Sequence, residues 1–350
     1  MNTAAVDQIA KAILYEGYML DPYRPSAVKN RQRFNFGVVY PQLFSEAQKW
    51  ADPCTMHVEC LVQGSIFTRL EVSLRCLQLT ERSVEEAVRV DNSPVAAFRP
   101  VKSLTVDGQT FHSWQEAVER DCKIPSDDLS VFHQHATQWP FVLAGAVSEE
   151  TLTDAAGVPV GRVVRVQEAI HGSVSIASHP VAPNVFKIVV RVDNFTPIDN
   201  ARQAGRDYAL MRSLVSAHIV LGVEAGGFVS LLDPPERLRS LAEGCKNQGA
   251  FPVLVGEPGR RDTMLASPII LYDYPQIAPE SAGDLFDSTE IDEILSLRIM
   301  TMTDDEKREM RESDERAREM LERTENMPAE HFMKLHGALR GLRPVKGEAS

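Results

Sequence analysis

Alternating apolar and polar residues predict that the middle of the chain folds into antiparallel β-strands. Residues 67–76, FTRLEVSLRC, place leucine, valine and cysteine on one face and mostly charged or hydroxyl side chains on the other. Residues 185–193, VFKIVVRVD, repeat this pattern. A strict period of two is typical of strands that bury one face. The predicted inward-facing residues of the second strand are Phe186, Ile188, Val190 and Val192.

Turn signals between these runs predict hairpins. Gly64-Ser65 follows the apolar run MHVECLVQ and predicts a hairpin that pairs residues 56–63 with residues 67–76. Asp107-Gly108 predicts a second, tight hairpin turn. Residues 218–232, HIVLGVEAGGFVSLL, predict a third hairpin that closes at Ala225-Gly226-Gly227. Further strands are expected at PVLVG (252–256) and SPIILYDY (267–274).

Helical spacing of apolar residues appears mainly towards the two ends of the chain. Residues 6–14 predict an N-terminal helix, and Pro22 and Pro25 prevent it from continuing. Near the C-terminus, Thr303 and Glu306 have the spacing of a capping box and precede a highly charged helical run. The sequence leaves open whether the C-terminal helices pack on the body. Residues 304–326 are the first candidate for an element that stands free, because their apolar seam is narrow.

These patterns predict an α+β protein with an antiparallel β-rich, sandwich-like body. We expect three parts: an N-terminal helix with an aromatic and basic docking segment (1–41), the β-rich α+β body (42–283), and a helical, acidic C-terminal extension (284–350). With 350 residues and 43% hydrophobic residues, the chain has ample material for a buried core.

Charge is unevenly distributed along the chain. The net charge of −12 argues against nucleic-acid binding, which depends on cationic surface that neutralises phosphates. Residues 284–325 contain 15 acidic and 7 basic residues, whereas residues 14–34 have a net charge of +2. The two ends of the chain are therefore electrostatically opposite.

The N-terminal residues and the cysteines favour a cytoplasmic protein. No secretory signal is visible at the start, and no apolar run approaches the roughly 20 residues of a membrane helix, so membrane insertion is not expected. The five cysteines are odd in number and widely spread, which suits reduced thiols in the core better than disulfides.

The strongest metal-site candidate is CTMHVEC, in which Cys54, His57 and Cys60 have a C-x2-H-x2-C spacing. Thiolate and imidazole are ligands that zinc prefers. On a β-strand, however, His57 would point away from both cysteines, and no second Cys/His pair stands nearby. We therefore expect structural cysteines, no bound metal and no cofactor.

Catalytic motifs are absent from the sequence. Residues 256–263, GEPGRRDT, lack the Gly-Lys-Ser/Thr of a P-loop, and residues 171–176, HGSVSI, lack the glycine spacing of a nucleophile elbow. An alternative hypothesis is an enzyme, or a small-molecule or metal-binding protein, with a site in the β-rich body. Its candidate residues follow strands or turns, where functional loops often lie: Asp233, Asp273, Asp284 and His218.

Residues 14–34, LYEGYMLDPYRPSAVKNRQRF, are the clearest candidate for a binding surface. Tyrosine and arginine are enriched at interface hot spots, because each offers a large contact area with directed polar groups. The alternative is that the tyrosines simply pack the N-terminal helix onto the sheet. The candidate partner-binding residues are Tyr15, Tyr18, Tyr23, Arg24, Lys29, Asn30, Arg31 and Arg33.

Three stretches together resemble an uncharacterised family of bacterial proteins. They are YEGYMLDPYRPSAVKNRQRFNFGVVYP (15–41), FVSLLDPPE (228–236) and the long run PVLVGEPGRRDTMLASPIILYDYPQIAPESAGDLFDSTEIDEILSLRIMTMTDDEK (252–307). The family is associated with gene clusters of oxygen-tolerant uptake nickel-iron hydrogenases. The resemblance implies a role beside such an enzyme, and it implies no catalytic residue.

The sequence thus leads to one main hypothesis: a non-catalytic accessory or assembly protein of a bacterial nickel-iron hydrogenase or a similar redox complex, acting through protein–protein contacts. Its partners would be hydrogenase subunits or the maturation machinery. In a variant of this hypothesis the partner is a second copy of the chain, so that the basic segment of one subunit meets the acidic extension of the other in a homodimer.

Overall fold

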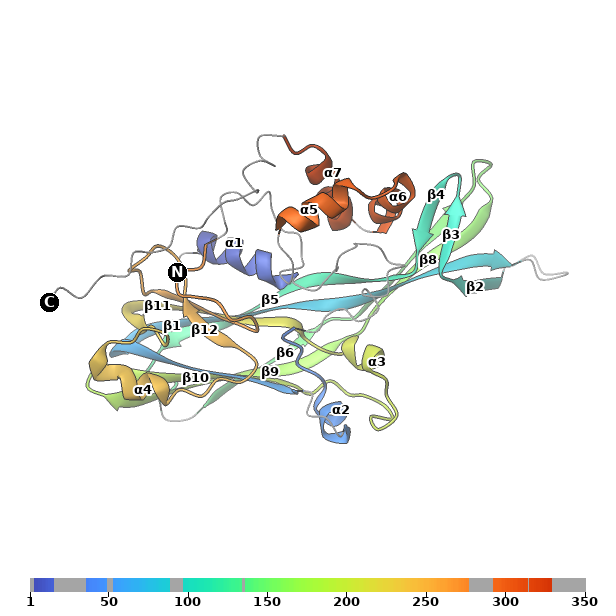
Figure 1. Ribbon diagram of the computed structural model, residues 1–350. Helices are drawn as coiled ribbons and strands as arrows, with labels where there is room; N and C mark the ends of the chain where they lie inside the picture. The colour runs from blue at the N-terminus through green and yellow to red at the C-terminus, as the bar shows by residue number, and fades with distance from the viewer. Residues whose placement is uncertain are drawn as a thin grey trace.

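The computed structural model describes residues 3–15, 36–48, 53–88, 97–133, 136–276, 292–313 and 315–328. These residues form a mostly antiparallel β-structure with short helices near the N-terminus and a helical group near the C-terminus (Figure 1). The predicted α+β class, with a β-rich body and helical ends, is confirmed. The proposed boundaries at residues 41 and 283 stay predictions.

One very long strand, β1 (Thr55–Val88), connects the parts of the sheet. Its first part pairs with β10 (Val185–Asn194), and its middle lies between β11 (Val215–Val229) and β5 (Trp114–Asp128). Its last part pairs with β2 (Ala97–Val101) and β8 (Pro159–Gln167). The hairpin predicted at Gly64-Ser65 is therefore wrong, because the chain continues through this point as a single strand.

Gly64 and Gly226 do not form turns. Both leave room for the side chain of Thr68. The Thr68 hydroxyl donates a hydrogen bond to the Ala225 carbonyl (3.0 Å) and accepts one from the Ser65 amide (3.0 Å). A Cβ on Gly64 would lie 2.2 Å from Thr68 Oγ1, and one on Gly226 would lie 2.7 Å from Thr68 Cγ2. β11 runs unbroken from Val215 to Val229, so the hairpin predicted to close at residues 225–227 is also wrong.

The sheet folds over itself into two layers. From one end its order is β12 (Phe251–Leu254), β13 (Thr263–Ser267), β11, β1, β10, β9 (Ile170–Ala182) and β6 (Thr137–Leu143). β9 and β10 lie in one layer, and β5, β11 and β12 in the other (Figure 1). The expected strand at 252–256 is β12, whereas β13 precedes the run 267–274 that was expected to be a strand.

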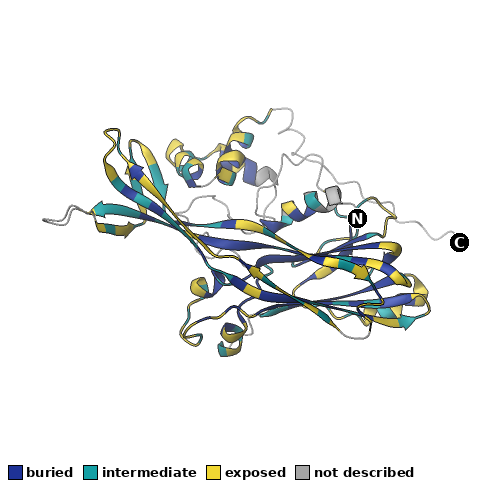
Figure 2. Cartoon of the chain, turned by 180° about the vertical axis from the view of Figure 1, so that it is seen from behind, coloured by how far each residue is buried: buried dark blue, intermediate teal, exposed yellow. Residues whose placement is uncertain are grey.

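A single large core fills the space between the layers. Inward positions of both halves of β1, of β9 and of β11 are buried in it, and Figure 2 shows buried positions along both layers. The predicted inward face of β10 is confirmed, since Phe186, Ile188, Val190 and Val192 all belong to this core. Burial of this apolar surface is the main stabilising contribution to such a body.

An arm of twisted strands projects from the body. It contains the end of β1 with β2, β7 (Ala146–Thr153) and β8, and the hairpin of β3 (Ser103–Val106) and β4 (Gln109–His112). The predicted turn at Asp107-Gly108 is confirmed, because both residues have positive φ angles (49° and 84°). Arg162 crosses the arm to pair with Glu85 (2.6 Å) and Glu149 (2.9 Å).

Short helices lie around the sheet, and several cover one of its outer faces. α1 (Thr3–Leu14), α5 (Asp292–Met300), α6 (Asp304–Ser313) and α7 (Glu315–Glu325) lie over the same layer (Figure 1). The other helical elements are α2 (Gln42–Ala47), α3 (Arg206–Leu210), η2 (Glu236–Leu238) and α4 (Arg239–Glu243). No helix in the described ranges has both the length and the apolar character needed to cross a bilayer.

The charged C-terminal run does not stand free. It forms two helices, α6 and α7, and its apolar seam is buried together with outward-facing residues of the sheet. The seam residues are Met310, Ala317, Met320 and Leu321, and the sheet residues include Leu77, Leu79 and Trp114. The question that the sequence left open is thereby answered, because the outer face of the sheet supplies a matching apolar surface.

Candidate functional site

The aromatic and basic segment begins at a fixed point of the structure. Tyr15, at the end of α1, is described, whereas the other predicted partner-binding residues lie outside the described ranges. Those residues are Tyr18, Tyr23, Arg24, Lys29, Asn30, Arg31 and Arg33. The structure therefore describes only the first residue of the predicted docking segment.

Tyr15 is held between the sheet and the C-terminal helices. Its side chain is buried, and the guanidinium of Arg316 on α7 lies over its ring at 3.9 Å from the ring centre. Arg316 also donates a hydrogen bond to the Tyr15 hydroxyl and pairs with Glu119 of β5 at 3.4 Å. Burial raises the pKa of Tyr15 well above its usual value, so the hydroxyl stays protonated.

The acidic helices next to Tyr15 form an ordered cap. The predicted capping box is confirmed: the Thr303 amide donates to Glu306 Oε2 (2.8 Å), and the Glu306 amide donates to Thr303 Oγ1 (3.3 Å). Lys307 and Arg311 of α6 both pair with Glu325 of α7, at 3.0 and 3.1 Å. Tyr15, where the basic segment begins, therefore lies beside helices that are rich in carboxylates.

The three candidate metal ligands lie on different sides of β1 and its start. Cys60 is buried in the main core, where burial raises the pKa of its thiol. His57 lies on the opposite face, with Nε2 3.3 Å from Glu59 Oε1, and the partly exposed Cys54 precedes the strand. Within the described ranges, no three His, Cys, Asp or Glu side chains are grouped to hold a metal ion.

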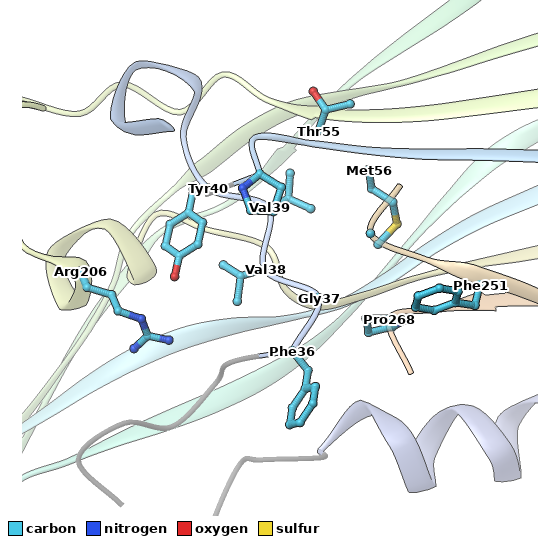
Figure 3. Close-up of a pocket in the computed structure, with 12 residues that line it drawn as sticks. Phe36, Gly37, Val38, Val39, Tyr40, Thr55, Met56, Arg206, Phe251 and Pro268 are labelled. Atoms are coloured by element: carbon cyan, nitrogen blue, oxygen red, sulfur yellow. The ribbon is translucent and has the colours of Figure 1, made fainter. Parts of the chain in front are cut away.

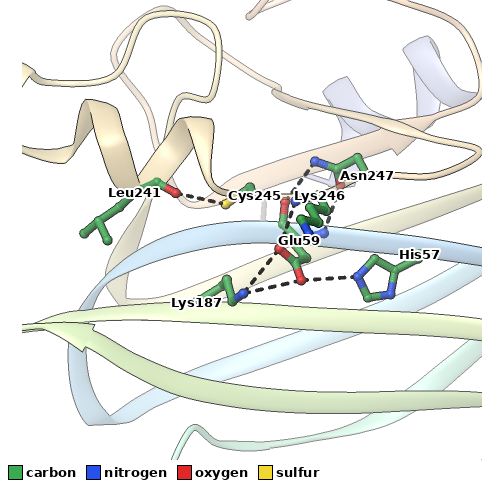
Figure 4. Close-up of polar contacts among 7 residues, drawn as sticks. All are labelled: His57, Glu59, Lys187, Leu241, Cys245, Lys246 and Asn247. Atoms are coloured by element: carbon green, nitrogen blue, oxygen red, sulfur yellow. Dashed lines mark hydrogen bonds and ion pairs between the residues drawn. The ribbon is translucent and has the colours of Figure 1, made fainter.

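A second polar cluster surrounds Glu59 (Figure 4). The Glu59 carboxylate accepts hydrogen bonds from the Lys246 amide (2.8 Å) and from the Lys187 ammonium (3.3 Å). The side chain of Asn247 bonds both to the Glu59 amide (2.9 Å) and to its carbonyl (3.2 Å). Burial acts to raise the pKa of the Glu59 carboxyl, but the Lys246 amide, His57 and Lys187 together outweigh it and lower the pKa.

This cluster is suited to holding a loop in place. It attaches residues 246 and 247 to β1, and Gln248 adds a pair of backbone hydrogen bonds to His57. Burial raises the pKa of the neighbouring Cys245 to about 11, so its thiol is protonated and a poor nucleophile near neutral pH. Sequence reasoning missed Glu59, although an acidic residue within the apolar run HVECLV was a usable signal.

The residues of the enzyme hypothesis are not gathered into one described site. Asp273 is engaged with the Leu254 amide (2.8 Å) and the Ser230 hydroxyl (2.5 Å), and Asp284 lies outside the described residues. His218 is fully buried, and its Nδ1 bonds to the Ser216 carbonyl. Asp233 is exposed on the loop after β11. In the described part of the chain no hydrogen bond joins Asp273 to His218.

A cavity of about 330 Å³ lies beside the segment Phe36–Tyr40 (Figure 3). The segment Phe36–Tyr40 crosses it, and the backbone of Gly37 has a φ of 55°. A Cβ at Gly37 would lie 2.6 Å from Pro268 Cγ, so this position needs glycine. The described lining residues are Phe36, Gly37, Val38, Val39, Tyr40, Pro53, Thr55, Met56, Arg206, Gly249, Phe251 and Pro268.

Sequence reasoning did not find this cavity, because its walls come from five separate segments of the chain. Comparison with known proteins adds no assignment: no protein-family model matches the chain, and no curated protein matches it. The interpretation therefore rests on the geometry of the described residues.

Proposed function

We propose that the protein is a non-catalytic accessory or assembly protein of a bacterial nickel-iron hydrogenase or a similar redox complex. It acts through protein–protein contacts made by the aromatic and basic residues that follow the buried Tyr15 (18–33) together with the acidic helices α6 and α7. Cytoplasmic subunits of the complex, or its maturation machinery, are the proposed partners. The link to hydrogenase rests on the resemblance of the three sequence stretches described above.

The contact between Tyr15 and Arg316 carries the docking proposal. It fixes the start of the basic segment against α7, although the two residues are 301 positions apart in the sequence. A docking segment that leaves from a fixed point loses less conformational freedom on binding than one on a free tail. The segment carries cations along its sequence and begins beside helices that carry carboxylates, which favours partners with patches of both charges.

Affinity purification from the native host, grown with hydrogenase expressed, tests this function. We expect hydrogenase subunits or maturation factors to co-purify in stoichiometric amounts, and the double substitution Arg24→Glu/Arg31→Glu to abolish their recovery. Arg237→Glu/Arg239→Glu is a matched control, because it changes the charge equally at two exposed positions of the body. Recovery of the protein alone, or equal recovery with both variants, would refute the proposal.

The homodimer variant has a separate test. If the basic segment of one subunit binds the acidic helices of another, the dimer is held partly by exposed charges and should dissociate as salt screens them. Sedimentation velocity at low and high ionic strength would show this shift. A monomer at low ionic strength rules out the homodimer and leaves heterologous docking unaffected.

A further inference from the structure

We infer that the cavity crossed by the segment Phe36–Tyr40 is a binding site for a small amphipathic monocarboxylate. Arg206 holds the carboxylate, and the aromatic and aliphatic walls enclose an apolar body. The inference does not depend on the accessory function, because none of the predicted docking residues is among the described lining residues.

The cavity has the position and size of a ligand site. It borders the main core, because the buried Val39 and Met56 belong both to that core and to the lining. Ligand pockets are commonly concave, a few hundred Å³ in volume, mainly apolar, and located at the mouths of closed β-structures. A second hollow, between α2 and residues 200–203, is more open and more polar.

Main-chain hydrogen bonds attach the crossing segment to the body, and its side chains form part of the walls. The carbonyls of Phe36 and Gly37 accept hydrogen bonds from Ser216 (3.2 Å) and Ala217 (2.9 Å). The Val39 amide donates to Leu214 (2.8 Å), and the Tyr40 amide donates to Pro53 (2.8 Å). These bonds hold the segment on both sides of Val38.

The polar side chains of the lining favour a ligand that carries a single negative charge. The Thr55 hydroxyl is engaged, since it donates to Asp193 (2.6 Å) and accepts from Arg191 (3.2 Å). Among the described lining residues Arg206 alone carries a formal charge. Its guanidinium has five N–H donors, enough for a contact within the protein and a paired contact to a carboxylate.

The arrangement of the walls indicates an elongated ligand. Arg206 and Tyr40 lie at one end of the site in Figure 3, and Met56, Phe251 and Pro268 lie at the other. A phosphate or a polyanion fits less well, because a single arginine neutralises little of its charge and the whole chain has a net charge of −12. A monocarboxylate with an aromatic or branched tail matches both ends.

Calorimetric titration with 3-phenylpropionate and with 3-phenylpropan-1-ol tests the inference. The two probes share a phenylpropyl skeleton and differ in the charged group. We expect the acid to bind at least about tenfold more tightly than the alcohol, because a paired charged hydrogen bond to arginine is stronger than a neutral one. Octanoate serves as an aliphatic probe with the same expectation.

Three variants locate the binding. Arg206→Gln should remove the preference for acid over alcohol, whereas Phe251→Ala should weaken both probes by shortening the apolar wall. Arg202→Gln is the matched control, because Arg202 is exposed nearby but is not among the described lining residues. If Arg206→Gln does not fold, Arg206→Lys is the substitute. It should retain the charge but lose part of the preference for acid over alcohol, because an ammonium group cannot make the paired contact of a guanidinium with a carboxylate.

The inference is overturned if none of the acids binds, or if acid and alcohol bind the wild-type protein equally. It is also overturned if Arg206→Gln and Arg202→Gln reduce acid binding by the same factor, since the effect would then be one of general charge. Retention of hydrogenase partners by Arg206→Gln would show that the two functions are separate.

Discussion

Arg316 lies with its guanidinium 3.9 Å from the centre of the Tyr15 ring and joins the last described helix to the first. The same side chain reaches Glu119 on β5, so one arginine connects α1, α7 and the sheet. Cation–π stacking and a hydrogen bond to a buried hydroxyl reinforce each other at this point. The acidic helices are therefore part of the folded body.

Removing this contact should loosen both ends of the chain. We expect Arg316→Ala to lower the free energy of unfolding by about 1–2 kcal/mol, because it leaves the buried Tyr15 hydroxyl without this donor. Urea unfolding followed by circular dichroism measures the change. Arg318→Ala is the control on the same helix, since its exposed pair with Glu315 (3.9 Å) should contribute less than about 0.5 kcal/mol. Equal losses of stability in the two variants would show that the stacked contact of Arg316 contributes no more than an exposed ion pair.

The buried seam of the C-terminal helices gives a second prediction. Met320 is 1% exposed and packs in the cluster that includes Leu77 and Leu79 of β1. We expect Met320→Ala to cost about 2–4 kcal/mol of stability and to open residues 304–325 to proteolysis. Glu319→Ala, at the neighbouring exposed position, should change stability by less than about 0.5 kcal/mol. Unchanged protease resistance in Met320→Ala would contradict the packing.

The sequence contained a signal for this packing that pattern reading overlooked. On the outer face of β1, residues 69, 71, 73 and 75 are polar, but Leu77 and Leu79 follow in the same phase. Two leucines on a face that should meet water indicate a covering element. Its identity could not be inferred, because the covering helices lie more than two hundred residues away and their seam has few apolar positions.

The sequence predicted correctly those features that depend only on residues close together in the chain. The inward face of β10 and the Asp107-Gly108 turn depend on neighbouring residues only, so the sequence predicted both. Gly64 and Gly226 were misread as turns because glycine serves equally for a turn and for close approach of another chain segment. Their partner, Thr68, gives no local sign of its role.

The candidate sites also combine features that are visible in the sequence with features that depend on tertiary structure. The aromatic and basic character of segment 14–34 is visible in the sequence, but the partnership of Tyr15 with Arg316 depends on tertiary structure. The cavity beside Arg206 combines residues from five separate segments, so no single motif encodes it.

The close packing around Thr68 gives a third prediction. A methyl group at Gly64 would lie 2.2 Å from Thr68 Oγ1, so Gly64→Ala must displace a buried hydroxyl that bonds to both strands. We expect a loss of about 2 kcal/mol or more in the free energy of unfolding.

Gly205→Ala is the matched control, because no atom lies within 4 Å of its Cβ position. It should be neutral or slightly stabilising, by up to about 1 kcal/mol. Equal destabilisation in both variants would contradict the proposed role of Thr68.

His218 should make stability depend on pH. Burial lowers its pKa to about 4, with a further contribution from the neighbouring Arg75, which pairs with Asp7 of α1 (2.6 Å). Between the usual histidine pKa of about 6.5 and this value, the unfolded chain binds a proton that the folded chain does not, so stability falls as pH decreases through this range. His218→Leu should flatten the dependence between pH 7 and about pH 5, which urea unfolding at several pH values would measure. Equal slopes in wild type and His218→Leu would mean that the buried imidazole does not control the acid sensitivity of the fold.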